Sequence, residues 1–231
     1  MQQNKRNQIQ AMFGRIAPRY DRMNRLMTFG RDQAWRRLVV QQARISNESN
    51  VLDIAAGTGD IAFEIRRQFP EARIVAADFA LPMMQVGKKR ESGQLVDWSA
   101  ADALHLPFRD ASFNAVVSGF LFRNVLDIEH ALSEQFRILQ MGGRIVSLDT
   151  SPPPDNLLRP FTNFYLRRVI PVVGRVITGD SDAYQYLPES TLAFKTPQAL
   201  TALMLDAGFV DVGYRRLMMG TIAVCWGSKP R

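Results

Sequence analysis

The sequence contains few of the residues that build disulfide frameworks and metal sites. Its 231 residues include a single cysteine, Cys225, which excludes an internal disulfide and fits a reducing compartment. Cys225 lies in an apolar run, so we expect a buried thiol. Only two histidines are present, and neither has metal-ligand spacing to a second ligand. We therefore expect no metal cofactor.

Long apolar runs are also missing. No run approaches the length of a membrane span, and the polar N-terminus has no signal-peptide core. We expect a soluble, cytoplasmic protein, or one attached peripherally to the inner face of the cell membrane. The 46% hydrophobic content is enough for one well-packed α/β domain with an elaboration.

Acidic residues are scarce in two stretches. Residues 1–44 contain ten Arg and Lys against two acids, whereas the rest of the chain holds 19 basic and 20 acidic residues. Residues 156–178 contain four arginines and no acid. Such segments favour anionic surfaces, either lipid headgroups or nucleic acid. The alternative is a solvated helix face.

Strand and helix patterns alternate after a helical N-terminal region, residues 8–44, that is interrupted near Gly30. The runs that read as strands are 51–54, 74–77, 96–100, 115–118, 144–148, 209–217 and 221–226, the last two as a hairpin. The runs that read as helices between them are 61–69, 82–91, 128–139, which we expect to end at Gly142-Gly143, and 196–208. This alternation predicts an α/β fold with a doubly wound, mostly parallel, seven-stranded sheet.

Ligands of such folds bind beyond the carboxyl ends of the strands, near the switch in strand order. Asp53, Asp78, Asp102 and Gly119 all fall at strand ends. We therefore expect them to line one site.

A glycine turn, Gly57-Thr58-Gly59, joins the first strand to the following helix. The next strand ends at Asp78, which is placed to accept hydrogen bonds from both ribose hydroxyls of an adenosine. The glycine spacing by itself also fits a dinucleotide site. This part of the sequence therefore predicts an adenosine cofactor without saying which one.

Two carboxylates that flank the turn, Asp53 and Asp60, separate these possibilities. A pyrophosphate favours backbone donors without negative charge nearby. Two acids instead suit the ammonium and sulfonium groups of S-adenosylmethionine. The alternative is that Asp53 is only a turn residue and Asp60 only a helix N-cap.

The connection from residue 151 to 195 is too long for an ordinary loop. It contains six prolines, but its aromatic and branched apolar residues argue against disorder. We expect an ordered lid with one helix, residues 157–169.

Several runs resemble the menaquinone/ubiquinone biosynthesis C-methyltransferases. Tyr-Asp-x-Met-Asn at residues 20–24 and Arg-Asn-Val at residues 123–125 are the most specific, and agreement extends over nearly the whole chain. The resemblance implies a single class I methyltransferase domain over residues 1–231, with a basic arm (1–44) and a substrate lid (151–195). It implies that S-adenosylmethionine methylates a ring carbon of a lipophilic polyprenylated quinol, most often demethylmenaquinol. A ubiquinone-pathway benzoquinol or another lipophilic small molecule is the alternative.

Cofactor contacts carried over by position are Thr58 in the glycine turn, Asp78 on the ribose, and Asp102 with Ala103 at the adenine. Asp102 is otherwise a turn residue. With the strand-end and turn residues, the expected cofactor site comprises Asp53, Gly57, Thr58, Gly59, Asp78, Asp102, Ala103 and Gly119.

The catalytic candidates implied by the resemblance are Arg123 and Asn124. Arginine stays charged at neutral pH, so Arg123 would stabilise a phenolate and Asn124 would orient the hydroxyl. The alternative is a hydrogen-bond network with Asp127 at a helix start. Tyr20 and Asp21 are further candidates that would close over the cofactor, or else form a packed helix terminus.

Two residues depart from the family pattern where the substrate is expected. Leu121 replaces a glycine, and Asp149 begins an Asp-Thr pair in place of the usual Glu-Phe. Both changes leave the cofactor expectation intact and the ring system of the substrate open.

Other classes fit the sequence less well. Amino-directed nucleic-acid methyltransferases carry an Asn/Asp-Pro-Pro-aromatic loop after the fourth strand, where this chain has Ser118-Gly-Phe-Leu121. Cytosine-C5 enzymes need a loop cysteine. We therefore expect no nucleic-acid partner; the partners expected are a quinol, an anionic membrane surface and, left open, a second copy in a homodimer. A catalytically idle S-adenosylmethionine-binding module is not separated from the enzyme by sequence.

Overall fold

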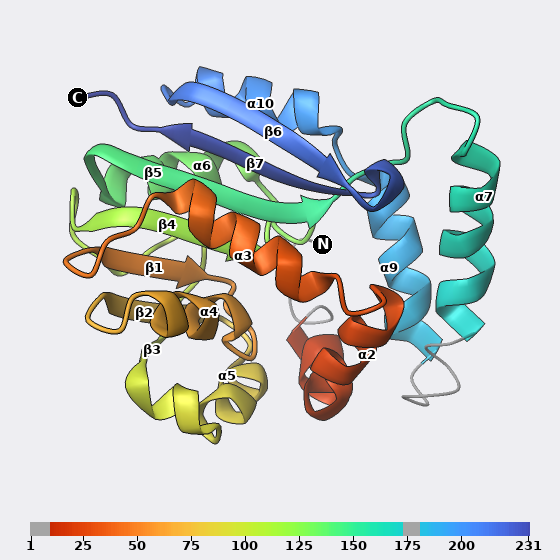
Figure 1. Cartoon of the computed structure of the whole chain (residues 1–231), viewed down its shortest axis with the longest axis horizontal. Coiled ribbons are helices and arrows are strands. Elements are labelled where there is room, and N and C mark those ends of the chain that lie inside the picture. Colours follow the sequence, from red (N-terminus) through yellow and green to blue (C-terminus); the bar gives the residue numbers. More distant parts are fainter. Residues whose placement is uncertain (1–9, 173–180) are drawn as a thin grey trace.

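Seven strands form one mixed sheet in the order β3-β2-β1-β4-β5-β7-β6 (Figure 1). The computed structural model describes residues 10–172 and 181–231. The first five strands pair in parallel, and β7 runs antiparallel to both β5 and β6. The strands are β1 (Asn50–Ile54), β2 (Arg73–Asp78), β3 (Asp97–Ala100), β4 (Phe113–Gly119), β5 (Leu139–Thr150), β6 (Val210–Leu217) and β7 (Ile222–Ser228). This confirms the predicted doubly wound, mostly parallel sheet, whose strand order reverses between β1 and β4.

Helices cover both faces of the sheet and give each face its own apolar cluster. On one face, α3 (Asp32–Ala43) and α4 (Asp60–Gln68) contribute Trp35, Val39 and Ile65 to the cluster. On the other face, α6 (Ile128–Ile138) and α10 (Pro197–Asp206) contribute Leu132 and Met204. The central strands are therefore buried on both sides, as expected for parallel strands rich in branched apolar residues. Helix α5 (Leu81–Lys88) contacts β2 and β3.

Local capping explains where two of these helices begin. Asp127 accepts a hydrogen bond from the backbone N–H of His130 at 2.9 Å, which starts α6. Thr196 accepts from the N–H of Ala199 at 3.3 Å, and Pro197 follows at the first position of α10, as the sequence predicts.

The predicted boundary between α6 and the fifth strand is wrong. We expected the helix to end at Gly142-Gly143, but α6 ends at Ile138 and β5 begins at Leu139. Leu139 already pairs with Phe113 of β4, and the register shifts before the pairing of Arg144 with Ala115. The two glycines lie in this irregular start of β5. The helix ends before them because pairing with β4 begins at the residue that directly follows it.

The N-terminal arm is a series of short helices. Residues 10–16 are helical, a 3-10 turn (Ala17–Arg19) follows, and α2 (Tyr20–Met27) leads to α3. Gly30, with a φ of +74°, interrupts the helical region as expected.

The segment predicted as a lid, residues 151–195 and still called the lid below, contains more helix in its described part than the sequence predicts. Helix α7 (Arg159–Phe164) continues into a π-helical turn (Tyr165–Val169), and a second helix, α9 (Ser181–Ala193), contains Pro188. The expectation of a single helix is therefore wrong. Proline disfavours a helix interior, but Leu187 and Leu192 of α9 pack against buried residues of the arm and of the segment that directly follows α7.

The arm and the lid share an apolar cluster that is separate from the two on the sheet. Its buried members are Met12, Ile16, Met23, Met27, Leu166 and Ile170. Figure 1 shows α2, α7 and α9 side by side, beyond the ends of the strands. Within the described ranges, no helix has the length and apolarity to cross a bilayer.

Candidate active site

The turn between β1 and α4 requires glycine at residue 59. Gly59 has a φ of +87°, and a Cβ there would lie 2.7 Å from the ring of Trp98 in β3. Gly57 has a φ of +58°, and its Cβ would lie 3.3 Å from the Cε of Met83 in α5. The backbone of the turn thus packs closely between neighbouring elements, directly before the N-terminus of α4.

Aspartates after β2 and β3 hold the neighbouring turns. The carboxylate of Asp78 accepts hydrogen bonds from the N–H groups of Gly57 and Ala80, each at 2.7 Å. Burial raises the pKa of Asp78, and these backbone donors oppose the rise. Asp102 accepts from the N–H of Leu104 at 3.1 Å. Each carboxylate oxygen can accept a second hydrogen bond, so both groups still have acceptor capacity.

A cavity of about 220 Å³, called the first cavity here, lies beyond the carboxyl ends of β1, β2 and β4. The structure places predicted residues from separate parts of the chain in its wall. Gly59, Asp21, Arg123 and Asp149 do not line it. The predicted residues that do are Tyr20, Asp53, Gly57, Thr58, Asp60, Asp78, Asp102, Ala103, Gly119, Leu121 and Asn124.

Asp53 is a fully buried carboxylate in this wall. Its Oδ2 accepts from the N–H of Ala62 at 3.0 Å, and its Oδ1 has no hydrogen-bond partner. Burial and, less strongly, the negative charges of Asp78 and Asp60 raise the pKa of Asp53 to about 8, against the lowering effect of the Ala62 hydrogen bond. An unpartnered buried acceptor of this kind is suited to a cationic donor group in the cavity.

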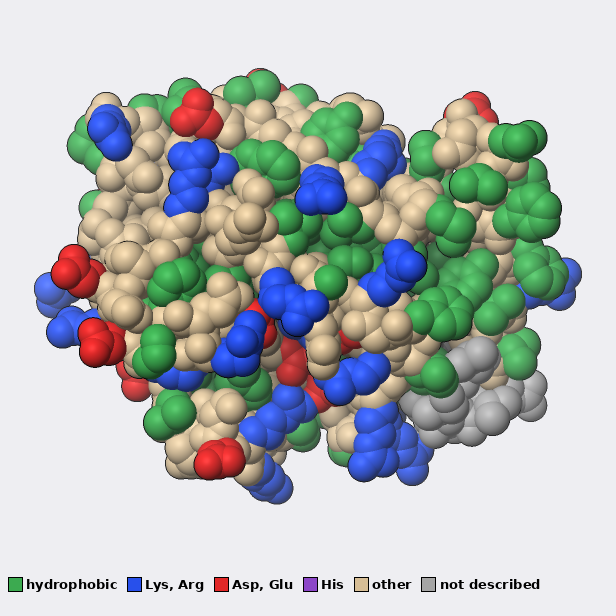
Figure 2. All heavy atoms as spheres, in the orientation of Figure 1, with side chains coloured by type: hydrophobic (Ala, Val, Ile, Leu, Met, Phe, Trp, Pro, Cys, Tyr) green, Lys and Arg blue, Asp and Glu red, His purple; other side chains and the backbone are tan. Residues whose placement is uncertain are grey.

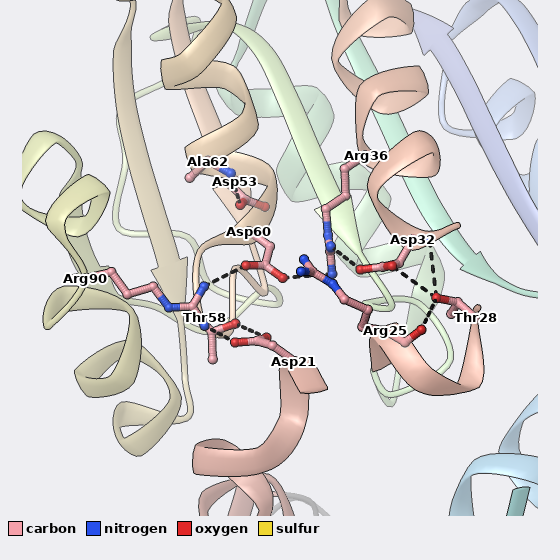
Figure 3. A network of polar contacts seen from close by, with 10 residues as sticks. All are labelled: Asp21, Arg25, Thr28, Asp32, Arg36, Asp53, Thr58, Asp60, Ala62 and Arg90. Atoms are coloured by element: carbon pink, nitrogen blue, oxygen red, sulfur yellow. Dashed lines mark hydrogen bonds and ion pairs between the residues drawn. The ribbon is translucent and has the colours of Figure 1, made fainter. Parts of the chain in front are cut away.

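Asp60 has a different environment (Figure 3). Its two oxygens form ion pairs with Arg36 and Arg90, both at 2.8 Å. Arg36 also pairs with Asp32 at 2.5 Å within α3. Of the two acids that flank the glycine turn, Asp60 is therefore already neutralised by protein groups.

Asp21 joins the arm to the glycine turn in the same network. It accepts from the hydroxyl of Thr58 at 2.7 Å and pairs with Arg90. The carboxylate of Asp21 is thus held by two protein partners at the rim of the first cavity, which it does not line.

A second cavity, of about 90 Å³, adjoins the first between the arm, the lid and the end of the sheet. The two cavities share Phe13, Tyr20, Asn24 and Phe120. Its wall is mainly apolar, with residues such as Met12, Leu166, Ile170, Leu187 and Ile222. Its few polar groups therefore stand out as possible points of recognition.

Arg123 is the charged group of the second cavity. Its side chain is 6% exposed and lies over the Phe120 ring, with 5.0 Å from Cζ to the ring centroid. Its Nε and Nη1 are buried without a hydrogen-bond partner. The nearest acid is Asp149, with 3.8 Å between Nε and Oδ1, beyond hydrogen-bond distance.

Asp149 lies behind Arg123 rather than in the cavity wall. Its oxygens accept from the backbone N–H groups of Arg123 at 3.2 Å and Thr150 at 2.8 Å. Burial raises the pKa of Asp149 to about 6, against the lowering effect of the Arg123 charge. Asp149 thereby fixes the chain that carries Arg123.

Both polar atoms of the Asn124 side-chain amide form hydrogen bonds with protein groups. Its Nδ2 donates to the carbonyl of Phe120 at 2.8 Å, and its Oδ1 accepts from the hydroxyl of Tyr186 at 3.0 Å. Asp127 caps α6 instead of bonding to the Arg123-Asn124 pair. The lid therefore reaches the loop after β4 through the Tyr186 hydroxyl.

Comparison with known proteins matches a family model, described as the ubiE/COQ5 methyltransferase family, to residues 1–229. The chain belongs to this family. A ubiquinone/menaquinone biosynthesis C-methyltransferase UbiE of Desulfotalea psychrophila is 48% identical, over 96% of this chain and 90% of that protein. A demethylmenaquinone methyltransferase of Thermus thermophilus is 45% identical, over 95% of this chain and 100% of that protein.

Solved structures share the fold of this ubiE/COQ5 family member at low sequence identity. Haemonchus contortus phosphoethanolamine N-methyltransferase 2, in complex with S-adenosyl-L-methionine, has a TM-score of 0.65 at 14% identity, over 86% of this chain and 53% of that one. The class I methyltransferase fold inferred from the sequence is confirmed. So is the prediction of an S-adenosylmethionine-dependent C-methyltransferase.

Sequence reasoning missed four polar residues of this methyltransferase site. Asn24 ends the Tyr-Asp-x-Met-Asn run, and Tyr186 begins a further run that agrees with the family, residues 186–190, but neither was assigned a role. Arg36 belongs to a third such run, residues 35–36, and only the fold shows that it meets Asp60. Arg90 belongs to no motif, so no signal in the sequence could have found it.

Proposed function

We propose that this chain methylates a ring carbon of a polyprenylated quinol, most readily demethylmenaquinol to menaquinol. The observation that carries the proposal is the junction of the two cavities. A cavity with an unpartnered carboxylate oxygen, suited to a cation, opens into an apolar cavity with unpartnered arginine N–H groups. A quinol has an apolar ring and tail and a hydroxyl that becomes anionic, so it matches the second cavity.

S-adenosylmethionine supplies an electrophilic methyl group on a positively charged sulfur. The residues present fit it, because the Oδ1 of Asp53 would accept from its ammonium and the Asp78 carboxylate retains acceptor capacity for the ribose hydroxyls. The remaining proposed cofactor residues are Gly57, Thr58, Gly59, Asp102, Ala103 and Gly119.

Arg123 would stabilise the phenolate form of the quinol. Its guanidinium stays charged at neutral pH, and low exposure strengthens its attraction for an anion. The ring carbon next to the phenolate would take the methyl group as S-adenosylhomocysteine leaves, and that carbon would then release its proton to solvent, which restores aromaticity. The apolar wall keeps water from this step.

The other proposed substrate-side residues support this arrangement. Tyr20 lines both cavities, and Leu121 lines the first, where its side chain would limit the room beside the methyl group to be transferred. Asn124 is fixed by Phe120 and Tyr186, and Asp149 by its backbone donors. Asp21 would keep the arm closed through Thr58.

We further propose that the enzyme works at the inner face of an anionic membrane. The outer side of the lid exposes Leu157 by 92%, Phe161 by 72%, Phe164 by 63% and Val172 by 62%, and Phe29 of the arm by 76%. Figure 2 shows hydrophobic side chains gathered over α7 and Lys and Arg side chains over the neighbouring arm. Exposed apolar residues bordered by cations are suited to an anionic bilayer.

The helix α7 links that surface to the second cavity. The π-helical turn that continues α7 brings Leu166 and the following Ile170 into the shared arm–lid cluster and the cavity wall, while Phe161 and Phe164 of α7 are exposed. A helix with apolar residues on both sides would lie between the bilayer and the cavity, and it gives an isoprenoid tail a continuous apolar route.

Turnover of defined quinols tests the proposal. The purified protein would be incubated with labelled S-adenosylmethionine and reduced demethylmenaquinone, with a ubiquinone-pathway benzoquinol and with RNA. Label in menaquinol supports the proposal, whereas label only in the benzoquinol or in RNA would refute it.

The single domain over residues 1–231 and the homodimer are proposals as well. We expect unfolding in one transition for the first and a dimer mass by light scattering for the second.

A further inference from the structure

Asn24 is the amide side chain that both cavities share. Of the four residues common to the two walls, Phe13 and Phe120 are apolar, and Tyr20 and Asn24 are polar. The Nδ2 of Asn24 is buried and has no hydrogen-bond partner. A buried N–H donor without a partner is unfavourable, so it persists where a ligand supplies the acceptor.

The neighbouring polar groups do not explain this donor. The amide of Asn124 is committed to Phe120 and Tyr186. The unpartnered N–H groups of Arg123 lie in the wall of the second cavity alone, and the unpartnered Oδ1 of Asp53 lies in the wall of the first alone. Asn24 is therefore the unpartnered donor at the junction, among the buried atoms of the described residues.

Methyl transfer has to occur at this junction, because the donor occupies one cavity and the acceptor ring the other. The ring oxygen next to the attacking carbon must lie there too. It gains negative charge when its proton leaves, and an N–H donor fixed in an apolar surrounding stabilises such charge without reorganisation.

We propose that Asn24 binds the acceptor, with its Nδ2 donating a hydrogen bond to the ring oxygen adjacent to the carbon that receives the methyl group. This rests on the proposed function, since it assumes a hydroxylated ring in the second cavity. Asn24 is then a substrate-binding residue that the arm contributes, and the acceptor site is complete only when α2 is packed against the lid.

The test compares Asn24→Leu, Asn24→Asp and Asn24→Ser with wild type, using saturating S-adenosylmethionine and reduced demethylmenaquinone. Asn24→Leu has nearly the same size without a donor, and we expect kcat to fall about 100-fold, the loss typical of one donor to a developing oxyanion. Affinity for S-adenosylmethionine, measured by calorimetry, should stay unchanged. Asn163→Leu, an amide of α7 that lines neither cavity, is the matched control and should keep wild-type kcat.

The pH profile separates binding from a structural role. Without the Asn24 donor the bound phenolate is less stable, so the acidic limb of kcat should move to higher pH. Asn24→Asp places a negative charge beside the phenolate and should move the limb further. Asn24→Ser provides a hydroxyl donor and should retain part of the activity. If Asn24→Leu does not fold, Asn24→Ser replaces it in the comparison with wild type.

Three results would overturn the inference. They are a loss of S-adenosylmethionine affinity with unchanged kcat, a lower kcat with an unmoved acidic limb, and a wild-type kcat in Asn24→Leu. If the wild-type protein methylates no quinol, the proposed function itself is refuted before any variant is compared. The two failures are therefore distinguishable.

Discussion

The two cavities lie side by side but depend on different parts of the molecule. The first is formed mainly by turns that follow β1, β2 and β4, strands that are buried on both faces of one sheet. The second is formed mainly by the arm and the lid, which pack in a separate apolar cluster. Its polar links are few, such as the Tyr165 hydroxyl to the Met27 carbonyl at 2.5 Å.

Because of this difference, the two sites depend on the stability of different parts of the fold. The turns of the first cavity are present whenever the sheet is folded. The second cavity exists only while the arm and lid are docked, since residues from segments more than a hundred positions apart make its wall. Variants should therefore affect donor binding and acceptor turnover independently.

The largest separation is expected for Arg123→Ala. Removal of the guanidinium withdraws charge stabilisation from the phenolate, so kcat should fall by roughly 10²- to 10³-fold. Affinity for S-adenosylmethionine should be unchanged, because Arg123 does not line the first cavity. Turnover assays measure the change in kcat, and calorimetry measures the affinity for S-adenosylmethionine. Arg123→Lys, which keeps the charge but not the planar fork, should fall between; full turnover of Arg123→Ala would show the assignment to be wrong.

A change on the outer side of the lid should affect membrane binding while sparing both cavities. The double variant Phe161→Ser/Phe164→Ser removes two exposed rings, and its partitioning onto anionic vesicles should fall at least about tenfold. Turnover of detergent-dispersed substrate should stay at the wild-type rate. Leu205→Ser changes another exposed apolar residue, on α10, and is the control. Vesicle binding that does not change with lipid charge, with salt concentration or with the loss of these two phenylalanines would count against the proposed surface.

Asp53→Asn should weaken donor binding and stabilise the fold. A neutral amide loses the charge-assisted bond to the ammonium, so affinity for S-adenosylmethionine should fall about tenfold. The pKa of Asp53 is raised to about 8 in the folded protein, so the folded state holds a proton that the unfolded state releases above pH 4. Wild-type stability should therefore decline from about pH 4 to 8, and Asp53→Asn should gain on the order of 1–3 kcal/mol at pH 8.

Urea unfolding of both proteins at pH 4 and pH 8 checks this sign. The difference between them should be small at the lower pH and largest at the higher one. A variant that is less stable than wild type at pH 8 would contradict the environment assigned to Asp53. In wild type, donor affinity should also increase as pH rises toward 8, because the ammonium binds the ionised carboxylate.

The smallest effect is expected for Asp21→Asn. This change weakens the links from the arm to Thr58 and Arg90, which are partly exposed ion-pair and hydrogen-bond contacts worth about 1 kcal/mol. The arm should be cleaved by trypsin several-fold faster at its exposed arginines, with donor affinity lowered only a few-fold. Glu64→Gln, which breaks an ion pair within α4 instead, is the control. Unchanged cleavage would show that these contacts do not hold the arm.

Local patterns predicted several turns and caps of the fold. Glycine at residue 59, a carboxylate at the end of β2 and a threonine cap before α10 each have a physical cause within a few residues, so they are readable from the sequence. The same reasoning failed at the start of β5, where long-range pairing with β4 determined the strand boundary. It also failed at α9, where packing against the arm outweighs Pro188.

The sequence alone determined the alternating α/β architecture, the strand-end carboxylates and the family, because periodicity and motifs are properties of adjacent residues. Only the tertiary structure decided which charges remain available. It paired Asp60 with two arginines and left one oxygen of Asp53 without a partner, and it brought Asn24, Arg123 and Tyr186 around one cavity. Those outcomes depend on contacts between distant segments, and burial then determines how strongly each charge acts.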